Sequence, residues 1–219
     1  MSFERIQAEE AKLQIFQKSS GNSYDLSFGS IQSKIILAVV SSSTEKLVIE
    51  IHSNVSSFIP LEMTHQFHLK IKDKKIYISD AFINSPVLGN KVYRLDDEYL
   101  QGYDGVQMAS FLDFKPNGKI KKIGNAKVST DLKTFNTSQY QINENSQTID
   151  FWITEEIKPF AIAAIRSSGR KKDHNYMLSY KEPIKYYRSK LDIRKAQKMD
   201  DKIKAILPKP SKSKHFLLP

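Results

Sequence analysis

The strongest constraint on the fold is the strict alternation of residue character over residues 62–72. The odd-numbered positions of this segment are apolar or aromatic: Met63, His65, Phe67, Leu69 and Ile71. Successive side chains of a β-strand point to opposite faces, so the alternation predicts a strand with one buried face. Asp73 and Lys74 then predict a hairpin turn into a second strand at residues 75–79.

Similar short runs, rich in β-branched and aromatic residues, recur along most of the chain and are separated by Gly, Ser or Pro-Asn-Gly turns. They lie at residues 24–28, 34–40, 46–51, 106–114, 119–128, 135–142, 148–153 and 160–165. About ten short strands with short turns predict an antiparallel meander. The stretch 84–104, with Pro86, Gly89 and Gly102, is expected to be a loop.

Both ends of the chain carry a helical pattern. Near the N-terminus, Phe3, Ile6, Leu13 and Phe16 fall close to helical spacing, which predicts a helix within residues 1–18. Beyond the strands the apolar residues again recur every three to four positions: Leu191, Ile193, Ala196, Met199, Ile203, Ile206 and Leu207. We therefore expect an antiparallel β domain at residues 19–182 and, at 183–219, a basic amphipathic helix that ends before Pro208, followed by an extended tail.

The positive charge of the chain is concentrated near its C-terminus. The formal net charge is +10, and residues 185–214 hold eleven Lys and Arg against three Asp, a local net charge of +8. Such a segment attracts anionic partners, which include nucleic acid, an anionic membrane surface and an acidic polymer of the cell envelope. The tyrosines near it, such as Tyr176 and Tyr186, would allow stacking on bases. The candidate polyanion-binding residues are Arg170, Lys171, Lys172, Arg188, Arg194, Lys195 and Lys198.

The sequence offers little support for catalysis. It contains no cysteine, no Gly-x-Ser-x-Gly motif and no Gly-x-x-x-x-Gly-Lys-Ser/Thr phosphate loop. His65 and His68 are close in sequence, but an odd spacing on a strand places the two rings on opposite faces, which disfavours a shared metal. We expect no metal, no cofactor and no catalytic residue. The alternative, a hydrolase, would draw its carboxylates from Asp96, Asp97, Glu98, Asp104, Asp113, Asp150, Glu155 and Glu156.

Four segments carry a family resemblance. Residues 119–128 and 134–140, followed by Ile149-Asp150-Phe151-Trp152-Ile153-Thr154 and Ile157-Lys158-Pro159-Phe160-Ala161-Ile162, resemble a signature of uncharacterised bacterial envelope proteins. Those proteins are similar in shape to the LolA/LolB half-barrels, in which a strongly curved antiparallel sheet surrounds an apolar hollow. The resemblance covers about a quarter of the chain. It departs from the family at residues 129–133, where the Pro and Gly of the family's turn are missing.

The pattern and the resemblance together predict a mainly β fold, with a strongly curved antiparallel sheet or half-barrel meander between an N-terminal helix and a basic C-terminal helix. The resemblance implies a non-catalytic protein of the periplasm or cell envelope that binds an apolar or lipid-like ligand, or serves as an interaction module for other envelope proteins. The charged N-terminus has no signal-like apolar run, which predicts a cytoplasmic protein if this N-terminus is native. The candidate ligand-lining residues are Phe67, Leu69, Phe111, Phe151 and Trp152.

Overall fold

The computed structural model describes residues 17–56, 61–72, 75–102, 121–144, 147–169 and 175–207. They form one sheet of twelve strands. The strands are β1 (Ser20–Phe28), β2 (Ile31–Ser42), β3 (Lys46–Ser56), β4 (Leu61–Lys72), β5 (Lys75–Asn84), β6 (Val92–Arg94), β7 (Lys121–Ser129), β8 (Thr134–Glu144), β9 (Gln147–Ile153), β10 (Ile162–Gly169), β11 (Tyr176–Ile184) and β12 (Gln197–Lys198). The prediction of a mainly β protein is therefore confirmed.

Two antiparallel meanders make up the sheet. The spatial order is β12-β6-β5-β4-β3-β2-β1-β11-β10-β9-β8-β7, so β1 to β6 run outward in one direction and β11 to β7 in the other. The two halves meet where β1 pairs with β11, with Tyr24 opposite Tyr180. β12 and β7 lie at opposite ends of this order, so the sheet formed by the described residues is open.

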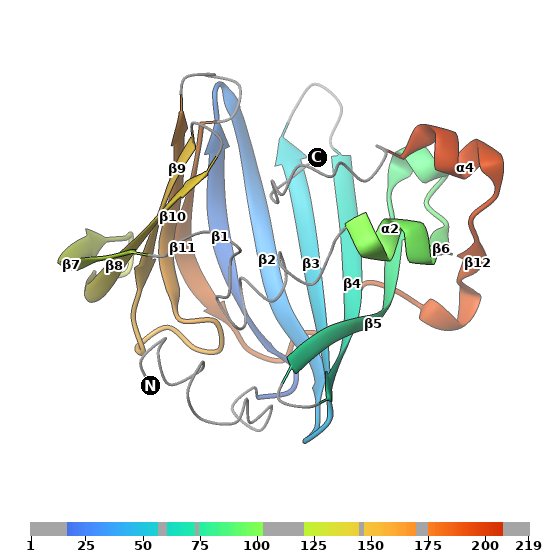
Figure 1. Ribbon diagram of the computed structural model, residues 1–219, viewed down its shortest axis with the longest axis horizontal. Helices are drawn as coiled ribbons and strands as arrows, with labels where there is room; N and C mark the ends of the chain where they lie inside the picture. Colours follow the sequence, from blue (N-terminus) through green and yellow to red (C-terminus); the bar gives the residue numbers. More distant parts are fainter. Residues whose placement is uncertain are drawn as a thin grey trace.

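The sheet is bent as well as twisted, and Figure 1 shows the strands wrapping into a curved layer. Register shifts interrupt several of its ladders, including those between Val39 and Ser41 on β2 and between His68 and Leu69 on β4. An extra residue in one strand bends that strand and increases its local twist. These irregularities are a local cause of the curvature.

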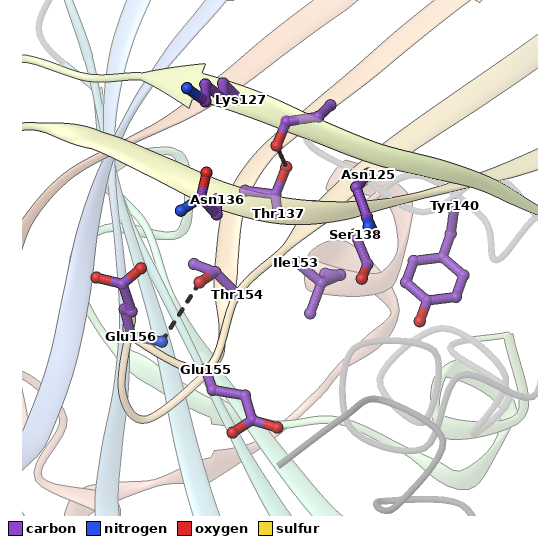
Figure 2. Close-up of a pocket in the computed structure, with 11 residues that line it drawn as sticks. Asn125, Lys127, Asn136, Thr137, Ser138, Tyr140, Ile153, Thr154, Glu155 and Glu156 are labelled. Carbon is purple, nitrogen blue, oxygen red and sulfur yellow. Dashed lines mark hydrogen bonds between the residues drawn. The ribbon is translucent and has the colours of Figure 1, made fainter.

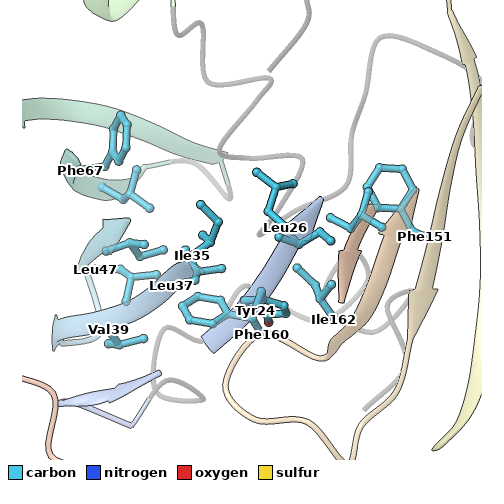
Figure 3. Close-up of a cluster of buried hydrophobic side chains, with 14 of the residues drawn as sticks. Tyr24, Leu26, Ile35, Leu37, Val39, Leu47, Phe67, Phe151, Phe160 and Ile162 are labelled. Atoms are coloured by element: carbon cyan, nitrogen blue, oxygen red, sulfur yellow. The ribbon is translucent and has the colours of Figure 1, made fainter. Parts of the chain in front are cut away.

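One face of the sheet collects the apolar side chains, and we call it the inner face. The registers place Tyr24, Ile35 and Phe67 on it, because residues directly opposite each other in a ladder share a face. Figure 3 shows these side chains in one cluster that extends from Phe67 of β4 to Phe151 of β9. Burial of this alternating set provides the main hydrophobic stabilisation of the fold.

The predicted helices are not found in the described residues. The N-terminal helix at 1–18 lies almost entirely outside them. The long C-terminal helix is wrong, because within the described residues 185–207 only α4 (Asp201–Ile206) is α-helical. Before α4 the segment is irregular, apart from the 3₁₀ turn η4 (Ile193–Lys195) and the short strand β12, which pairs parallel with β6. The sheet is thus antiparallel except at this edge.

Hydrogen bonds to the sheet explain why residues 185–192 are not helical. We call this segment the strap. The backbone N–H of Tyr187 donates to Ser19 O at 2.7 Å, and that of Lys190 donates to a carboxylate oxygen of Glu50 at 2.7 Å. Tyr186 also has a φ of 62°, which a helix does not allow. Leu191 and Met199, which supplied part of the helical spacing, are buried from non-helical backbone instead.

The predicted loop at residues 84–104 has regular structure. It contains the 3₁₀ turn η2 (Pro86–Leu88), the strand β6 and the helix α2 (Asp97–Gly102). The strand expected at 106–114 lies outside the described residues. Within the described part of the chain, no helix has the length and apolar character needed to cross a membrane.

Candidate functional site

A hollow of about 650 Å³ lies at the β7 end of the sheet, between the β7–β8 hairpin and the turn that follows β9 (Figure 2). This volume is within the usual range of small-molecule pockets. We call it the hairpin pocket. It is lined by Asn125, Ala126, Lys127, Asn136, Thr137, Ser138, Tyr140, Ile153, Thr154, Glu155 and Glu156.

The alternation of β8 decides which side chains share the wall of the pocket. Asn136, Ser138 and Tyr140 have the same parity and therefore point to the same face of the strand. Across the hairpin, Lys127 is opposite Asn136, and Asn125 is opposite Ser138. The hairpin thus brings four polar side chains together on one wall.

Two residues of the buried cluster form the apolar floor. Tyr140 and Ile153 are 7% and 5% exposed, and both belong to the apolar cluster of the inner face. Ile153 lies opposite Ser138 in the β8–β9 ladder, and Phe151 lies opposite Tyr140. The hairpin pocket is therefore continuous with the inner face.

The turn at residues 154–161 forms the opposite wall. Its ends are joined by the Thr154 N–H, which donates to Ala161 O at 2.8 Å. The buried side chain of Asn22 on β1 also holds it, since Nδ2 donates to Lys158 O at 2.8 Å and Oδ1 accepts from the Phe160 N–H at 3.4 Å. These bonds fix the position from which Glu155 and Glu156 extend.

Charges of opposite sign lie on the two walls. Figure 2 shows Lys127 on the hairpin side and Glu155 and Glu156 on the turn side. Glu156 also accepts a hydrogen bond from Lys133 Nζ at 2.5 Å, in an ion pair whose side chains are about half exposed. The pocket therefore offers hydrogen-bond donors on one wall and carboxylate acceptors on the other.

The side chains predicted to line a ligand site lie elsewhere. Phe67, Leu69 and Phe151 are on the inner face and are 1%, 1% and 8% exposed, so they are packed core residues. Trp152 lies on the opposite face, where the Arg166 guanidinium is 5.3 Å from its ring centroid. Phe111 is outside the described residues. None of the four described residues lines the hairpin pocket.

Three buried hydroxyls on the inner face have no hydrogen-bond partner among the described residues: those of Tyr24, Ser167 and Tyr176. Ser167 and Tyr176 are directly opposite each other in the β10–β11 ladder. Burial raises the pKa of both tyrosines, so they stay protonated and can donate a hydrogen bond. An unpaired buried hydroxyl costs about 1–3 kcal/mol, which a polar group reaching it would recover.

The candidate polyanion-binding residues that the structure describes are exposed. Arg188 lies on the strap, while Arg194, Lys195 and Lys198 follow it along the chain. Asp192 pairs with Arg194 at 2.8 Å and with Lys195 at 3.6 Å, which offsets part of their charge. The run of Arg170, Lys171 and Lys172 lies outside the described residues.

The carboxylates of the hydrolase alternative are dispersed. Asp96 pairs with Lys204 of α4 at 2.5 Å. Asp150 is on β9 and pairs with Arg166, while Glu155 and Glu156 lie at the hairpin pocket. Asp104 and Asp113 are outside the described residues. In the part of the chain that the structure describes, no three His, Asp or Glu side chains are grouped as metal ligands.

The polar lining of the hairpin pocket was not predicted from the sequence. The available signal was the alternation of Asn136, Ser138 and Tyr140, because one face of a strand that carries polar groups and then an aromatic residue can border a cavity. Sequence alone could not show that the turn after β9 faces this strand.

Comparisons with known proteins reveal little relationship. No family model matches the chain, and no curated protein matches it. Among solved structures, the hypothetical protein CT021 from Chlamydia trachomatis is similar with a TM-score of 0.45 and 10% sequence identity, over 83% of this chain and 94% of that chain.

Proposed function

We propose that this protein is a non-catalytic binding protein whose hairpin pocket holds a small amphipathic, lipid-like ligand. The observation that carries the proposal is the composition of the pocket: Tyr140 and Ile153 of the apolar cluster form its floor, and amides, hydroxyls and charged groups surround them. Pockets that combine an apolar surface with a few placed polar groups are typical of small-molecule sites. The apolar part of the ligand lies on the floor, and its polar part contacts the walls.

The inner face adds support for an amphipathic ligand. On this proposal the curved sheet functions as a half-barrel, with its hollow beginning at the hairpin pocket. The unpaired hydroxyls of Ser167 and Tyr176 lie on the same face and would bind a polar atom that reaches them. The same proposal places the protein in the periplasm or cell envelope. Cell fractionation tests that location, and recovery of the protein only with cytosolic markers would contradict it.

Native mass spectrometry of the gently purified protein tests ligand binding. We expect an added mass, or uptake of a fatty acid or a single-chain phospholipid supplied below its micelle concentration. Asn136→Trp fills the pocket from an exposed position, so it should abolish uptake without disturbing the core. Asn143→Trp is the control, because Asn143 is an exposed residue of β8 outside the pocket lining. A wild-type protein without uptake, or equal uptake by both variants, would contradict the proposal.

A second candidate function is binding of a polyanion at the strap and the residues after it. The observation that favours it is the exposure of Arg188 and Lys198, neither of which forms an ion pair with another described residue. Tyr186, two residues before Arg188, is 88% exposed. Binding to single-stranded DNA or heparin should weaken steeply with added salt, and Arg188→Gln with Lys198→Gln should reduce it. Salt-insensitive binding, or none, would reject this function.

A further inference from the structure

We infer that the hairpin pocket selects a zwitterionic head group, with its oxyanion on the β7–β8 wall and its ammonium on the wall formed by the turn after β9. This inference rests on the proposed function and specifies the polar half of the ligand. It follows from the separation of the charged side chains between the two walls.

The β7–β8 wall fits an oxyanion. Lys127 supplies a positive charge, and Asn136 directly opposite it supplies an amide donor. Asn125 and Ser138 form the next cross-strand pair and add another amide and a hydroxyl. Hydrogen bonds from a cation to a phosphate or carboxylate are about twice as strong as neutral ones, and the neighbouring donors bind its remaining oxygens.

The turn wall fits an ammonium. Glu155 and Glu156 are consecutive exposed residues of a turn that Asn22 fastens to β1. Glu156 bonds to Lys133, but a carboxylate has about four acceptor positions and can accept from a second cation. The turn therefore holds two carboxylates at the rim of the pocket, on the opposite side from Lys127.

The charge balance of the pocket disfavours a ligand of single sign. Lys127 and Lys133 offset Glu155 and Glu156, so the site has a dipole and almost no net charge. An anionic head group would meet the carboxylates, and a cationic one would meet Lys127. Only a zwitterionic head group finds an opposite charge on both walls. Repulsion between like charges disfavours purely anionic and purely cationic head groups.

The probes are lysophosphatidylethanolamine, which is zwitterionic, and lysophosphatidylglycerol, which is anionic and has the same acyl chain. Binding is measured below the micelle concentration by titration calorimetry and native mass spectrometry. We expect the zwitterion to bind about tenfold more tightly. Lys127→Gln and Glu155→Gln should each weaken its binding about fivefold, and Glu155→Gln should also narrow the preference over the anion. Lys121→Gln, an exposed change on the same strand outside the pocket, is the matched control.

The outcomes separate the two levels of the proposal. If both lipids bind equally and the Lys127 and Glu155 changes have no effect, selection of a zwitterionic head group is rejected. Binding of an amphipathic ligand would still be supported. Binding of neither lipid contradicts the proposed function itself. Free phosphoethanolamine is the third probe. If it competes only at far higher concentration, the source is a lipid. If phosphoethanolamine competes as well as the lysolipid, recognition of the zwitterionic head group is supported and a lipid-like ligand is rejected.

Discussion

The carboxylate of Glu50, which is wholly buried on β3, accepts a 2.6 Å hydrogen bond from the hydroxyl of Tyr187 in the strap. The other donors to Glu50 are the Lys190 N–H, the Ser189 hydroxyl and the Gln66 amide, at 2.6 to 2.8 Å. No cation pairs with Glu50 among the described residues. A buried carboxylate that is satisfied only by hydrogen bonds depends on each of its donors. The strap therefore stabilises the buried Glu50 side chain, and Glu50 holds the strap in place.

Glu50→Gln should therefore loosen the strap. The new amide NH₂ would face donors that need an acceptor, which we expect to lower the free energy of unfolding by about 2–4 kcal/mol. Urea denaturation measures this loss, and hydrogen exchange at the Lys190 amide should accelerate. Glu182→Gln is the control, because Glu182 is 53% exposed and its ion pair with Lys34 should contribute less than about 1 kcal/mol. Equal effects of the two changes would contradict an anchoring role.

The same contacts show why the C-terminal segment was predicted wrongly. The spacing of Leu191 and Met199 fits a helix, and local sequence contains nothing against it. The competing interaction comes from Glu50, which lies 140 residues before Lys190 in the chain and draws its backbone N–H away from helical bonding. A long-range contact of this kind overrides local propensity and has no sequence signature.

The strands, by contrast, were largely predictable. Their signal is local, since the alternation that marks β4 arises from burial of one face alone. Alternation also separates neighbouring residues: Phe151 and Trp152 are consecutive, so they could not both line one hollow. Contacts between residues far apart in the sequence determine the pairing of β1 with β11 and the position of the turn after β9. The hairpin pocket depends on the position of that turn, so it could not be predicted.

Removing the guanidinium of Arg166 should destabilise the fold, because the buried Asp150 carboxylate would lose its cationic partner. Burial alone would raise the pKa of Asp150, but hydrogen bonds from Arg166, Gln141 and Gln139 lower it overall. Arg166→Met leaves this carboxylate, only 3% exposed, without its cation, and we expect a loss of about 1–3 kcal/mol at pH 7.

The pH dependence provides the check on that change. A depressed pKa stabilises the folded wild type above the ordinary Asp value, and this contribution disappears as pH falls through the depressed pKa. The difference between wild type and Arg166→Met should therefore shrink toward pH 3. Lys34→Met, which breaks an exposed pair, should show little difference at either pH. A loss that is independent of pH would contradict the role of the Asp150 charge.

The inner-face histidine should make the fold less stable in mild acid. Burial lowers the pKa of His65 to about 4, and its ring stacks on Phe67 with centroids 6.0 Å apart. Between pH 6.5 and 4 the unfolded chain binds a proton at His65 that the folded chain does not, so stability falls as pH falls. From pH 7 to 5 the loss should be about 2 kcal/mol. Urea denaturation should show a smaller loss for His65→Leu than for the control Met63→Leu, and equal losses would contradict this assignment.

The contact between β1 and β2 at Gly21 leaves no room for a side chain. A Cβ there would lie 2.6 Å from Leu37 O and 3.0 Å from Cβ of Ala38, and both strands are fixed by their other neighbours in the sheet. Gly21→Ala should therefore destabilise the protein by about 2–4 kcal/mol in urea denaturation. Ser27→Ala, on the same face of β1, should have an effect below about 0.5 kcal/mol. Adding Ala38→Gly should recover only part of the loss, because it removes the contact with Cβ but leaves the one with the Leu37 carbonyl. Full recovery would mean that the side chain of Ala38, and not the backbone of β2, limits the approach of the two strands.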